Sequence, residues 1–278
     1  MDETTAPTTP TTAGFGAQLR SWRTRRRLSQ QDLSLLAEVS TRHLSFLETG
    51  RSRPSRAMVL ALAEHLAVPL RERNDLLLAA GHAPAYPHRP LDAPEMSAVR
   101  AAVDRILHGH EPLPAVAVDR RWDLVAANAP VAALTAGVSA EVLGPPTNVY
   151  RLTLHPGGLA PLIVNLEEVA HHLLDRLSRD LEATGDPDLA ALHDEVRRYP
   201  TVSSLPTHID VPTGVVVPFR LRHPQGQLNL FTTVTTFGTP ADVTVSELAL
   251  ELFYPLDEAT AARLTALAEA ARATPADA

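Results

Sequence analysis

The stretch from Leu28 to Ser55 places several polar side chains at spacings that suit contact with nucleic-acid bases. Thr41, Arg42 and Ser45 fall on the outer, N-terminal face of one expected short helix. An arginine can donate two parallel hydrogen bonds to guanine, and hydroxyl groups suit smaller contacts with bases or phosphates. This pattern predicts a helix that enters the major groove of DNA and reads base edges there.

Other residues around this helix suit the sugar–phosphate backbone. Gln30 begins the preceding expected helix, where a backbone N–H and a side-chain amide can meet a phosphate. Arg51 and Arg53 lie in G-R-S-R-P-S just beyond the groove helix. Seven DNA contacts are therefore predicted, at Gln30, Ser40, Thr41, Arg42, Ser45, Arg51 and Arg53. The alternative is an ordinary helical bundle with a solvated basic face.

Charge is distributed unevenly along the chain. The 278 residues have a net charge of −7, yet residues 14–69 hold nine arginines against four acidic residues. That segment is therefore basic and the remainder strongly acidic. An acidic chain with one basic segment indicates a local nucleic-acid contact rather than general polyanion binding.

The elements that must position these residues are short helices with polar caps. Phe15, Leu19 and Trp22 recur at i, i+4 and i+7, which indicates one face of a first helix. Ser29 and Ser40 are expected N-caps, and Asp32 completes a capping box with Ser29. Further helices are expected over 30–37, 41–49, 55–66 and 70–80, with Gly50 and Gly81 ending the third and fifth.

The segments S-Q-Q-D-L, V-S and L-E-T-G-R-S-R-P-S give residues 15–80 a family likeness. This region resembles the Xre family of lambda-repressor-like helix-turn-helix regulators. The resemblance implies an all-α, five-helix DNA-binding domain and an ion pair between Arg23 and Glu48 that holds the fold. The chain departs from the family at Glu38, where the turn usually has glycine. If that position needs a positive φ, Glu38 costs about 1 kcal/mol there.

The pattern changes beyond Gly81. The prolines of residues 81–94 predict an extended linker. Helices are then expected over 95–108, 128–136, 159–183, 188–199 and 257–273, and strands over 115–119, 122–127, 148–154, 214–222, 227–237 and 243–253. The later strands are rich in β-branched residues, as in T-T-V-T-T. Residues 95–273 are therefore predicted to form an α+β domain with an antiparallel sheet.

The order strand, turn, strand and helix from Leu113 to Pro130 resembles the start of a PAS-type sensor domain. The fuller pattern is similar to the MmyB-like ligand-binding domain, through W-D-L-V-A-A-N, N-V-Y-R-L-T-L-H-P-G-G-L and I-V-N-L. That resemblance implies a PAS-like sheet over an apolar cavity and a small fatty-acid-like ligand.

Four residues of this second part are candidate ligand contacts. Arg151 or His155 could meet a carboxylate, Trp122 could line a wall, and Asn128 could touch the ligand. Three of them also have a structural alternative. Trp122 suits a plain core position, Asn128 suits a helix N-cap, and Arg151 could pair with an acidic helix.

Several function classes are disfavoured. All 25 basic residues are arginine and cysteine is absent, so lysine and thiolate nucleophiles are excluded. None of the twelve histidines has compact metal-ligand spacing, and no phosphate-binding or nucleophile-elbow motif occurs. We therefore expect no catalytic residues, no metal and no cofactor apart from the possible fatty-acid-like ligand.

Residues 1–14 read as a disordered tail without signal-peptide character, and no apolar run of membrane-spanning length occurs. The sequence favours a cytoplasmic homodimer that binds a palindromic operator under control of a small apolar molecule. The alternative is a regulator whose second domain serves only dimerisation or protein-partner binding. An enzyme fused to a DNA-binding domain is a third hypothesis, disfavoured by the absent motifs.

Overall fold

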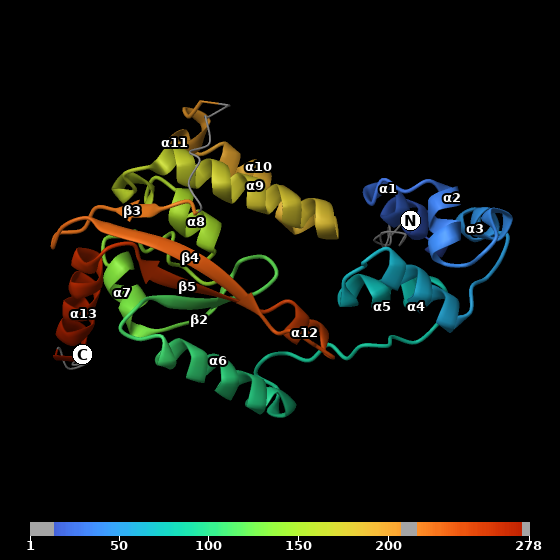
Figure 1. Ribbon diagram of the computed structural model, residues 1–278, viewed down its shortest axis with the longest axis horizontal. Helices are drawn as coiled ribbons and strands as arrows, with labels where there is room; N and C mark the ends of the chain where they lie inside the picture. The colour runs from blue at the N-terminus through green and yellow to red at the C-terminus, as the bar shows by residue number, and fades with distance from the viewer. Residues whose placement is uncertain (1–13, 207–215, 274–278) are drawn as a thin grey trace, which may run out of the picture. The chain divides into compact units, whose positions relative to one another are not determined.

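The chain folds into two compact units, one ending at His88 and one beginning at Arg89 (Figure 1). The computed structural model describes residues 14–206 and 216–273. Most of the predicted N-terminal tail therefore lies outside the described residues. No described helix is long and apolar enough to cross a lipid bilayer.

The N-terminal unit is entirely helical in its described residues. Its helices are α1 (Phe15–Arg25), α2 (Gln30–Leu36), α3 (Thr41–Glu48), α4 (Arg56–His65) and α5 (Leu70–Ala79). Phe15, Leu19 and Trp22 of α1 are buried together with Leu33 and Leu44 in one core. The apolar spacing of the first helix therefore marks its buried face, as the sequence predicts.

Polar caps fix where the short helices begin. The Ser29 hydroxyl accepts a hydrogen bond from the Asp32 N–H, and the Asp32 carboxylate accepts one from the Ser29 N–H, which completes the expected capping box. The hydroxyls of Ser40 and Ser55 likewise accept from the backbone N–H groups of His43 and Met58. These caps satisfy N–H groups that have no partner within the helix.

The turn between α2 and α3 carries backbone strain. Glu38 has φ of 53°, in the left-handed region that favours glycine. Left-handed backbone costs a non-glycine residue about 1–2 kcal/mol. Glutamate at this position therefore makes the helix pair less stable than glycine would.

The first half of the expected linker is bound to the helical unit. The buried Asn74 side chain accepts hydrogen bonds from the N–H groups of Ala85 and Tyr86 and donates one to the Tyr86 carbonyl. A ring nitrogen of His82 lies 3.0 Å from the Pro54 carbonyl oxygen. Residues 82–86 thus belong to the helical unit rather than to a free connection.

The C-terminal unit is built on a five-stranded antiparallel sheet in the order β2-β1-β5-β4-β3. Its strands are β1 (Ala115–Val118), β2 (Leu124–Ala127), β3 (Phe219–Leu221), β4 (Leu228–Thr236) and β5 (Ala249–Pro255). In the central pairs, Glu251 of β5 lies opposite Val116 of β1 on one side and Val234 of β4 on the other. This register places Glu251 in the middle of the sheet.

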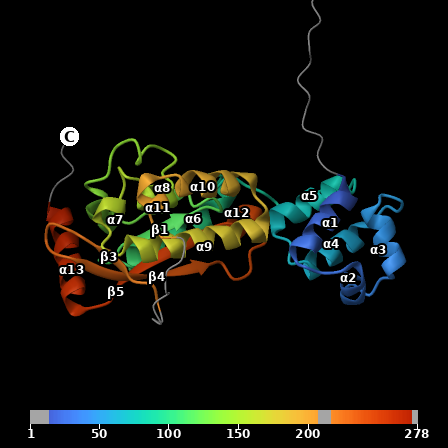
Figure 2. The same cartoon turned by 90° about the horizontal axis from the view of Figure 1, so that it is seen from above.

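Helices cover the sheet on both faces. The α-helices of this unit are α6 (Ser97–Gly109), α7 (Ala129–Thr135), α8 (Val149–Leu154), α9 (Leu166–Thr184), α10 (Pro187–Arg197), α11 (Pro200–Ser203), α12 (Val243–Ser246) and α13 (Glu258–Ala273), with 3-10 turns at Pro94–Met96 and Ala160–Leu162. The larger core lies between the sheet and the α8–α10 layer, where α9 and α10 pack together (Figure 2). A smaller core joins α6 to the opposite face of β1 and β5.

The predicted α+β class with an antiparallel sheet is confirmed, and two of the expected strands are wrong. Residues 148–154 form helix α8, because the Asn148 side chain accepts hydrogen bonds from the N–H groups of Tyr150 and Arg151 and caps a helix there. The segment predicted as a strand over 243–253 begins as α12, capped by Asp242, before β5 starts at Ala249. The part of the strand expected at 214–222 that precedes residue 216 lies outside the described residues.

Candidate DNA interface and apolar cavity

Two exposed arginines share one aromatic ring on the outer side of α3. The guanidinium carbon of Arg42 lies 5.3 Å from the centre of the Phe46 ring, and that of Arg51 lies 6.0 Å from it. Neither guanidinium forms a hydrogen bond or ion pair with any residue in the described part of the chain. Cation–ring contacts hold these side chains without using their N–H groups. Both arginines therefore keep their donors available for an anionic partner.

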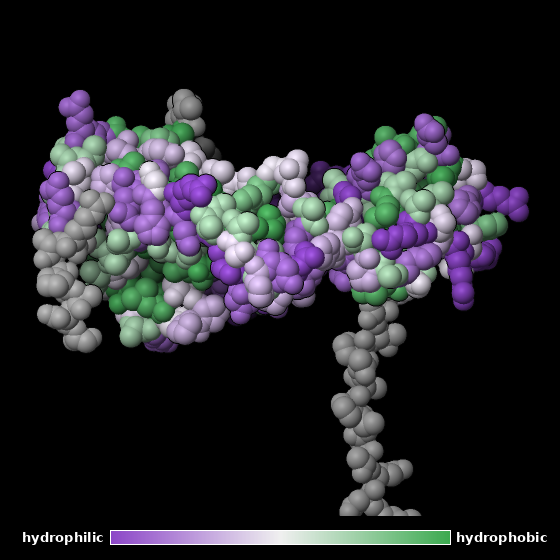
Figure 3. Space-filling view, turned by 90° about the horizontal axis from the view of Figure 1, so that it is seen from below, coloured by the Kyte–Doolittle hydropathy of each residue, from purple (hydrophilic) through white to green (hydrophobic). Residues whose placement is uncertain are grey.

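The remaining predicted DNA contacts divide into two sets. The side chains of Ser45 and Arg53 have no hydrogen bond to any described residue. Three others already hold the fold. The Thr41 and Ser34 hydroxyl oxygens lie 3.0 Å apart, Ser40 caps α3, and the Gln30 amide donates to Glu48 over 2.7 Å. Long hydrophilic side chains project from this unit in the view of Figure 3.

A buried ion pair fixes α3 against α1. Arg23 donates from Nε to Glu48 Oε1 over 2.6 Å and from Nη2 to Oε2 over 3.0 Å, which is the pair that the family resemblance implies. Burial opposes ionisation of Glu48, but the hydrogen bonds from Arg23 and Gln30 outweigh it and hold its pKa below the usual range. Helix α3 is therefore anchored at its C-terminal end by a charge pair.

The two helices also approach closely through a glycine. A Cβ atom added at Gly16 of α1 would lie 2.5 Å from the Glu48 carbonyl oxygen and 2.6 Å from that of Leu47. Both atoms are backbone and cannot rotate away. Gly16 thus permits the separation at which Arg23 reaches Glu48.

An apolar cavity lies in the C-terminal unit between the sheet and helices α7, α8 and α9. Its volume of about 90 Å³ is several times the roughly 15 Å³ that one water needs. The lining residues are Pro114, Val116, Val131, Leu134, Thr135, Val149, Leu152, Thr153, Leu159, Val169, His172, Leu173, Arg176, Val217, Pro218, Phe219, Thr232, Glu251 and Phe253. A mostly apolar wall with a few polar groups is the usual composition of a small-molecule site.

Arg176 and Glu251 form a charge pair in the wall of this cavity. Arg176 Nη1 donates to Glu251 Oε1 over 3.2 Å, and Arg176 Nε donates to the Tyr150 hydroxyl over 3.1 Å. Arg176 Nη2 is buried and has no hydrogen-bond partner among the described residues. Burial raises the pKa of Tyr150 to about 12. The wall therefore carries one cation and one anion in contact, with one nitrogen of the cation unsatisfied.

None of the four ligand contacts predicted from sequence lines the cavity. Arg151 makes two hydrogen bonds of 2.8 Å to Glu195, and the His155 ring packs edge-on against Tyr199. The buried Asn128 side chain accepts from the Ala115 N–H and donates to the carbonyls of Leu107 and Leu113. These three side chains have partners within the fold.

Trp122 stands one layer behind the cavity. Its ring supports the guanidinium of Arg176 at 3.8 Å, and its indole N–H donates to Asp180 over 3.0 Å. Its φ of 63° lies in the left-handed region. Trp122 thus positions the wall arginine, and its strained backbone needs support from its surroundings.

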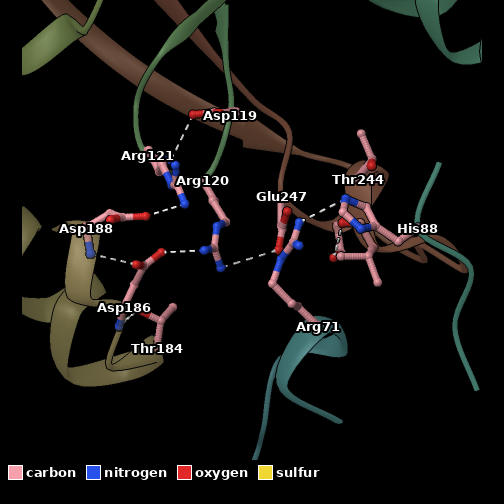
Figure 4. A network of polar contacts seen from close by, with 12 residues as sticks. Arg71, His88, Asp119, Arg120, Arg121, Thr184, Asp186, Asp188, Thr244 and Glu247 are labelled. Carbon is pink, nitrogen blue, oxygen red and sulfur yellow. Dashed lines mark hydrogen bonds and ion pairs between the residues drawn. The ribbon is translucent and has the colours of Figure 1, made fainter. Parts of the chain in front are cut away.

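The turn before Trp122 supplies that support (Figure 4). The Asp119 carboxylate accepts from the N–H groups of Arg121 and Asp123. Arg120 Nη2 lies 2.8 Å from Asp186 Oδ2, and Arg121 pairs with Asp188. These contacts tie the turn to the start of α10.

Two charges on otherwise apolar faces are the sequence signals that point to Arg176 and Glu251. Arg176 follows Val169 and Leu173 by seven and three residues, so a charge interrupts the apolar face of α9. Glu251 lies between Ala249 and Phe253 on the same face of β5, because residues two apart in a strand point to one side. A charged residue on an otherwise buried face marks an internal polar site. Within the described residues, no group of three or more metal-ligating side chains is gathered.

Comparisons with known proteins match both units. Residues 99–267 match the family described as the MmyB-like transcription regulator ligand binding domain, and residues 15–76 match a helix-turn-helix domain. The uncharacterized HTH-type transcriptional regulator RghRB of Bacillus subtilis (strain 168) is 32% identical over 112 residues, which are 39% of this chain and 78% of that protein. The crystal structure of the clp gene regulator ClgR from C. glutamicum is 30% identical, with a TM-score of 0.22, over 24% of this chain and 83% of that one.

Proposed function

This chain belongs to the MmyB-like transcription regulators, and we propose that it binds one operator sequence under the control of a small apolar ligand. The helix-turn-helix unit makes it a DNA-binding regulator rather than an enzyme, and the second unit is a ligand-binding domain. We further propose which residues contact DNA, that the chain forms a homodimer, and that the ligand is fatty-acid-like. The observation that carries it is the Arg42–Phe46–Arg51 stack with both guanidinium groups unpaired among the described residues.

In this proposal α3 enters the major groove. Arg42 donates two hydrogen bonds to guanine, and Ser45 and Thr41 make smaller contacts with neighbouring bases. Arg51 and Arg53 bind phosphates beyond the helix, and the N-terminal ends of α2 and α3 meet phosphates at Gln30 and Ser40. The bonds that Gln30, Ser40 and Thr41 make within the fold fix these side chains before DNA arrives, so binding loses less side-chain entropy.

The regulator acts as a homodimer on a palindromic operator. One helix-turn-helix unit covers only a half-site, and two-fold protein symmetry matches a palindrome whose half-sites are about one helical turn apart. The ligand is fatty-acid-like and occupies the cavity lined by α7, α8, α9 and the sheet. It changes operator binding by binding one dimer geometry more tightly than another.

Selection of binding sites from a random DNA pool tests the DNA part of the proposal. The full chain is expected to enrich a two-fold symmetric motif with two guanine-containing half-sites. Enrichment without any shared sequence would contradict it.

Two arginine variants then distinguish a base contact from a phosphate contact. Arg42→Ala is expected to lose about 1–3 kcal/mol of discrimination at one base position, because a bidentate contact is removed. Arg51→Ala should weaken all sequences alike and lower the salt slope of binding by about one. If Arg42→Ala weakened binding to all sequences alike and Arg51→Ala changed discrimination at one base position, α3 would bind DNA in another orientation.

A further inference from the structure

We propose that Phe46 of α3 contacts the C5-methyl group of a thymine that lies close to the guanine bound by Arg42. The inference rests on the proposed function, in which α3 enters the major groove of the operator. It adds a base preference that comes from an apolar contact and not from a hydrogen bond.

Phe46 lies on the same face of α3 as the side chains proposed to contact bases. Arg42, Ser45 and Phe46 stand at i, i+3 and i+4, a spacing that places residues on one side of a helix. Leu44 and Leu47 are the buried apolar residues of this helix, and they mark its opposite side. Phe46 is therefore directed away from the core of the N-terminal unit.

The packing of Phe46 agrees with this direction. Phe15 and Trp22 belong to the buried core of the N-terminal unit. Within the described residues, Phe46 belongs neither to that core nor to the partly buried apolar side chains packed against it. Its half-buried ring instead contacts the guanidinium groups of Arg42 and Arg51, at 5.3 and 6.0 Å. A large apolar ring is thus held at the surface between two cations that suit DNA.

The two cation–ring contacts also limit the movement of the ring. Side chains in an α-helix lean toward its N-terminus, so the Phe46 ring lies over the turn that begins at Arg42. Arg51, which follows the C-terminal end of α3, approaches the same ring. A side chain that is already held in place loses less entropy when a partner binds. Phe46 is therefore prepared for contact before DNA arrives.

Among the four bases, thymine has the group in the major groove that suits such a ring. Adenine, guanine and cytosine present hydrogen-bond donors and acceptors there, whereas thymine adds a C5-methyl group. The Phe46 ring has no hydrogen-bonding N–H or oxygen, so against a polar base edge it would remove water without replacing the lost hydrogen bonds. Against the methyl group it buries apolar surface on both partners. Phe46 therefore favours thymine over the other three bases.

The separation of Arg42 and Phe46 limits where this thymine lies. Four helix residues advance about 6 Å along the helix axis, and successive base pairs are about 3.4 Å apart. The thymine should therefore lie within about two base pairs of the guanine that Arg42 contacts.

The test removes the methyl group from the DNA and leaves the protein intact. An operator is selected from a random pool with the full chain, and each thymine of one half-site is replaced in turn by deoxyuridine. Fluorescence anisotropy at fixed salt then gives the dissociation constant of each duplex. One replacement near the guanine should weaken binding about fourfold, the effect expected for one buried methyl group.

The outcomes of this test separate the inference from the proposed function. If a shared operator sequence is selected but no replacement weakens binding, the inference is wrong and sequence-specific DNA binding stands. Selection without any shared sequence would contradict both.

Two variants of Phe46 show whether this side chain makes the contact. Phe46→Ala removes the ring and should bind the thymine and deoxyuridine duplexes equally, whereas Phe46→Leu keeps an apolar side chain and should retain part of the difference. The matched control is Leu78→Ala, which removes an exposed apolar side chain of α5 and should keep the full difference.

An unchanged difference in folded Phe46→Ala would mean that another group contacts the methyl, and would overturn the inference. Phe46 lies outside the core, so this variant should fold. If it does not fold, the wild-type comparison of the two duplexes decides.

Discussion

The candidate DNA interface and the apolar cavity hold their arginines in opposite ways. Arg42 and Arg51 are exposed and rest on one aromatic ring with their donors free of other described residues. Arg176 is buried between Trp122 and Glu251 with its charge balanced. An exposed cation with free donors favours a polyanion such as DNA, whereas a buried and balanced cation is held by its partners within the fold. The environment of an arginine, more than its presence, therefore indicates its partner.

The largest expected effect is the loss of stability in Arg176→Ala, which we compare with the small loss in Arg42→Ala. Arg176→Ala should lower the free energy of unfolding of the C-terminal unit by about 3–5 kcal/mol, because it leaves Glu251 buried without its partner. Arg42→Ala should change the stability of its unit by less than about 0.5 kcal/mol, because its side chain is exposed.

Urea unfolding followed by tryptophan fluorescence measures this contrast. Trp22 lies in one unit and Trp122 in the other, so a Trp22→Phe parent reports on the C-terminal unit and a Trp122→Phe parent on the N-terminal unit. Similar small losses for both arginine variants would mean that Arg176 is not a structural charge and would remove the basis of the comparison.

The next effect concerns the close contact between α1 and α3. Gly16→Ala should lower the stability of the N-terminal unit by about 1–3 kcal/mol, because its Cβ would overlap backbone atoms of α3. Gly14→Ala is the matched control, since nothing described lies within 4 Å of the added atom. The same unfolding assay applies, and equal losses for the two variants would show that α1 and α3 do not pack this closely.

The smallest expected effect is an increase in the stability of the N-terminal unit. Glu38→Gly should stabilise the N-terminal unit by about 0.5–1 kcal/mol, because glycine relieves the positive φ but loses more backbone entropy on folding. Glu38→Ala removes the same charge and keeps the strain, so it should bring no gain. A gain of equal size in both variants would assign the effect to charge.

Much of the helical unit follows from local patterns in the sequence. The capping box of Ser29 and Asp32 and the apolar spacing in α1 involve residues near one another in the chain, and the structure has them as expected. The Arg23–Glu48 pair joins residues far apart in the chain, and it followed from the family resemblance rather than from spacing. The strain at Glu38 was expected only if the turn needed a positive φ, and that condition holds.

The cavity could not be derived in the same way. Residues 148–154 carry β-branched and aromatic side chains that favour a strand, yet the Asn148 cap and burial of Tyr150 make them helical. The pairing of Arg176 with Glu251 depends on how α9 lies over the sheet and on the register of β5, which a single sequence does not specify. Trp122, Asn128, Arg151 and His155 have polar groups of suitable type, but the fold gives each of them a partner outside the cavity.

The central claim is that occupation of the C-terminal cavity changes DNA binding by the N-terminal unit. Fluorescence anisotropy of a selected operator, titrated with the full chain at fixed salt, tests it directly with and without saturating decanoate, a simple fatty acid. A change of roughly fivefold or more in the dissociation constant is expected, in the usual range of coupling between two sites. Identical titrations in the two conditions, with decanoate binding established by calorimetry, would contradict the account.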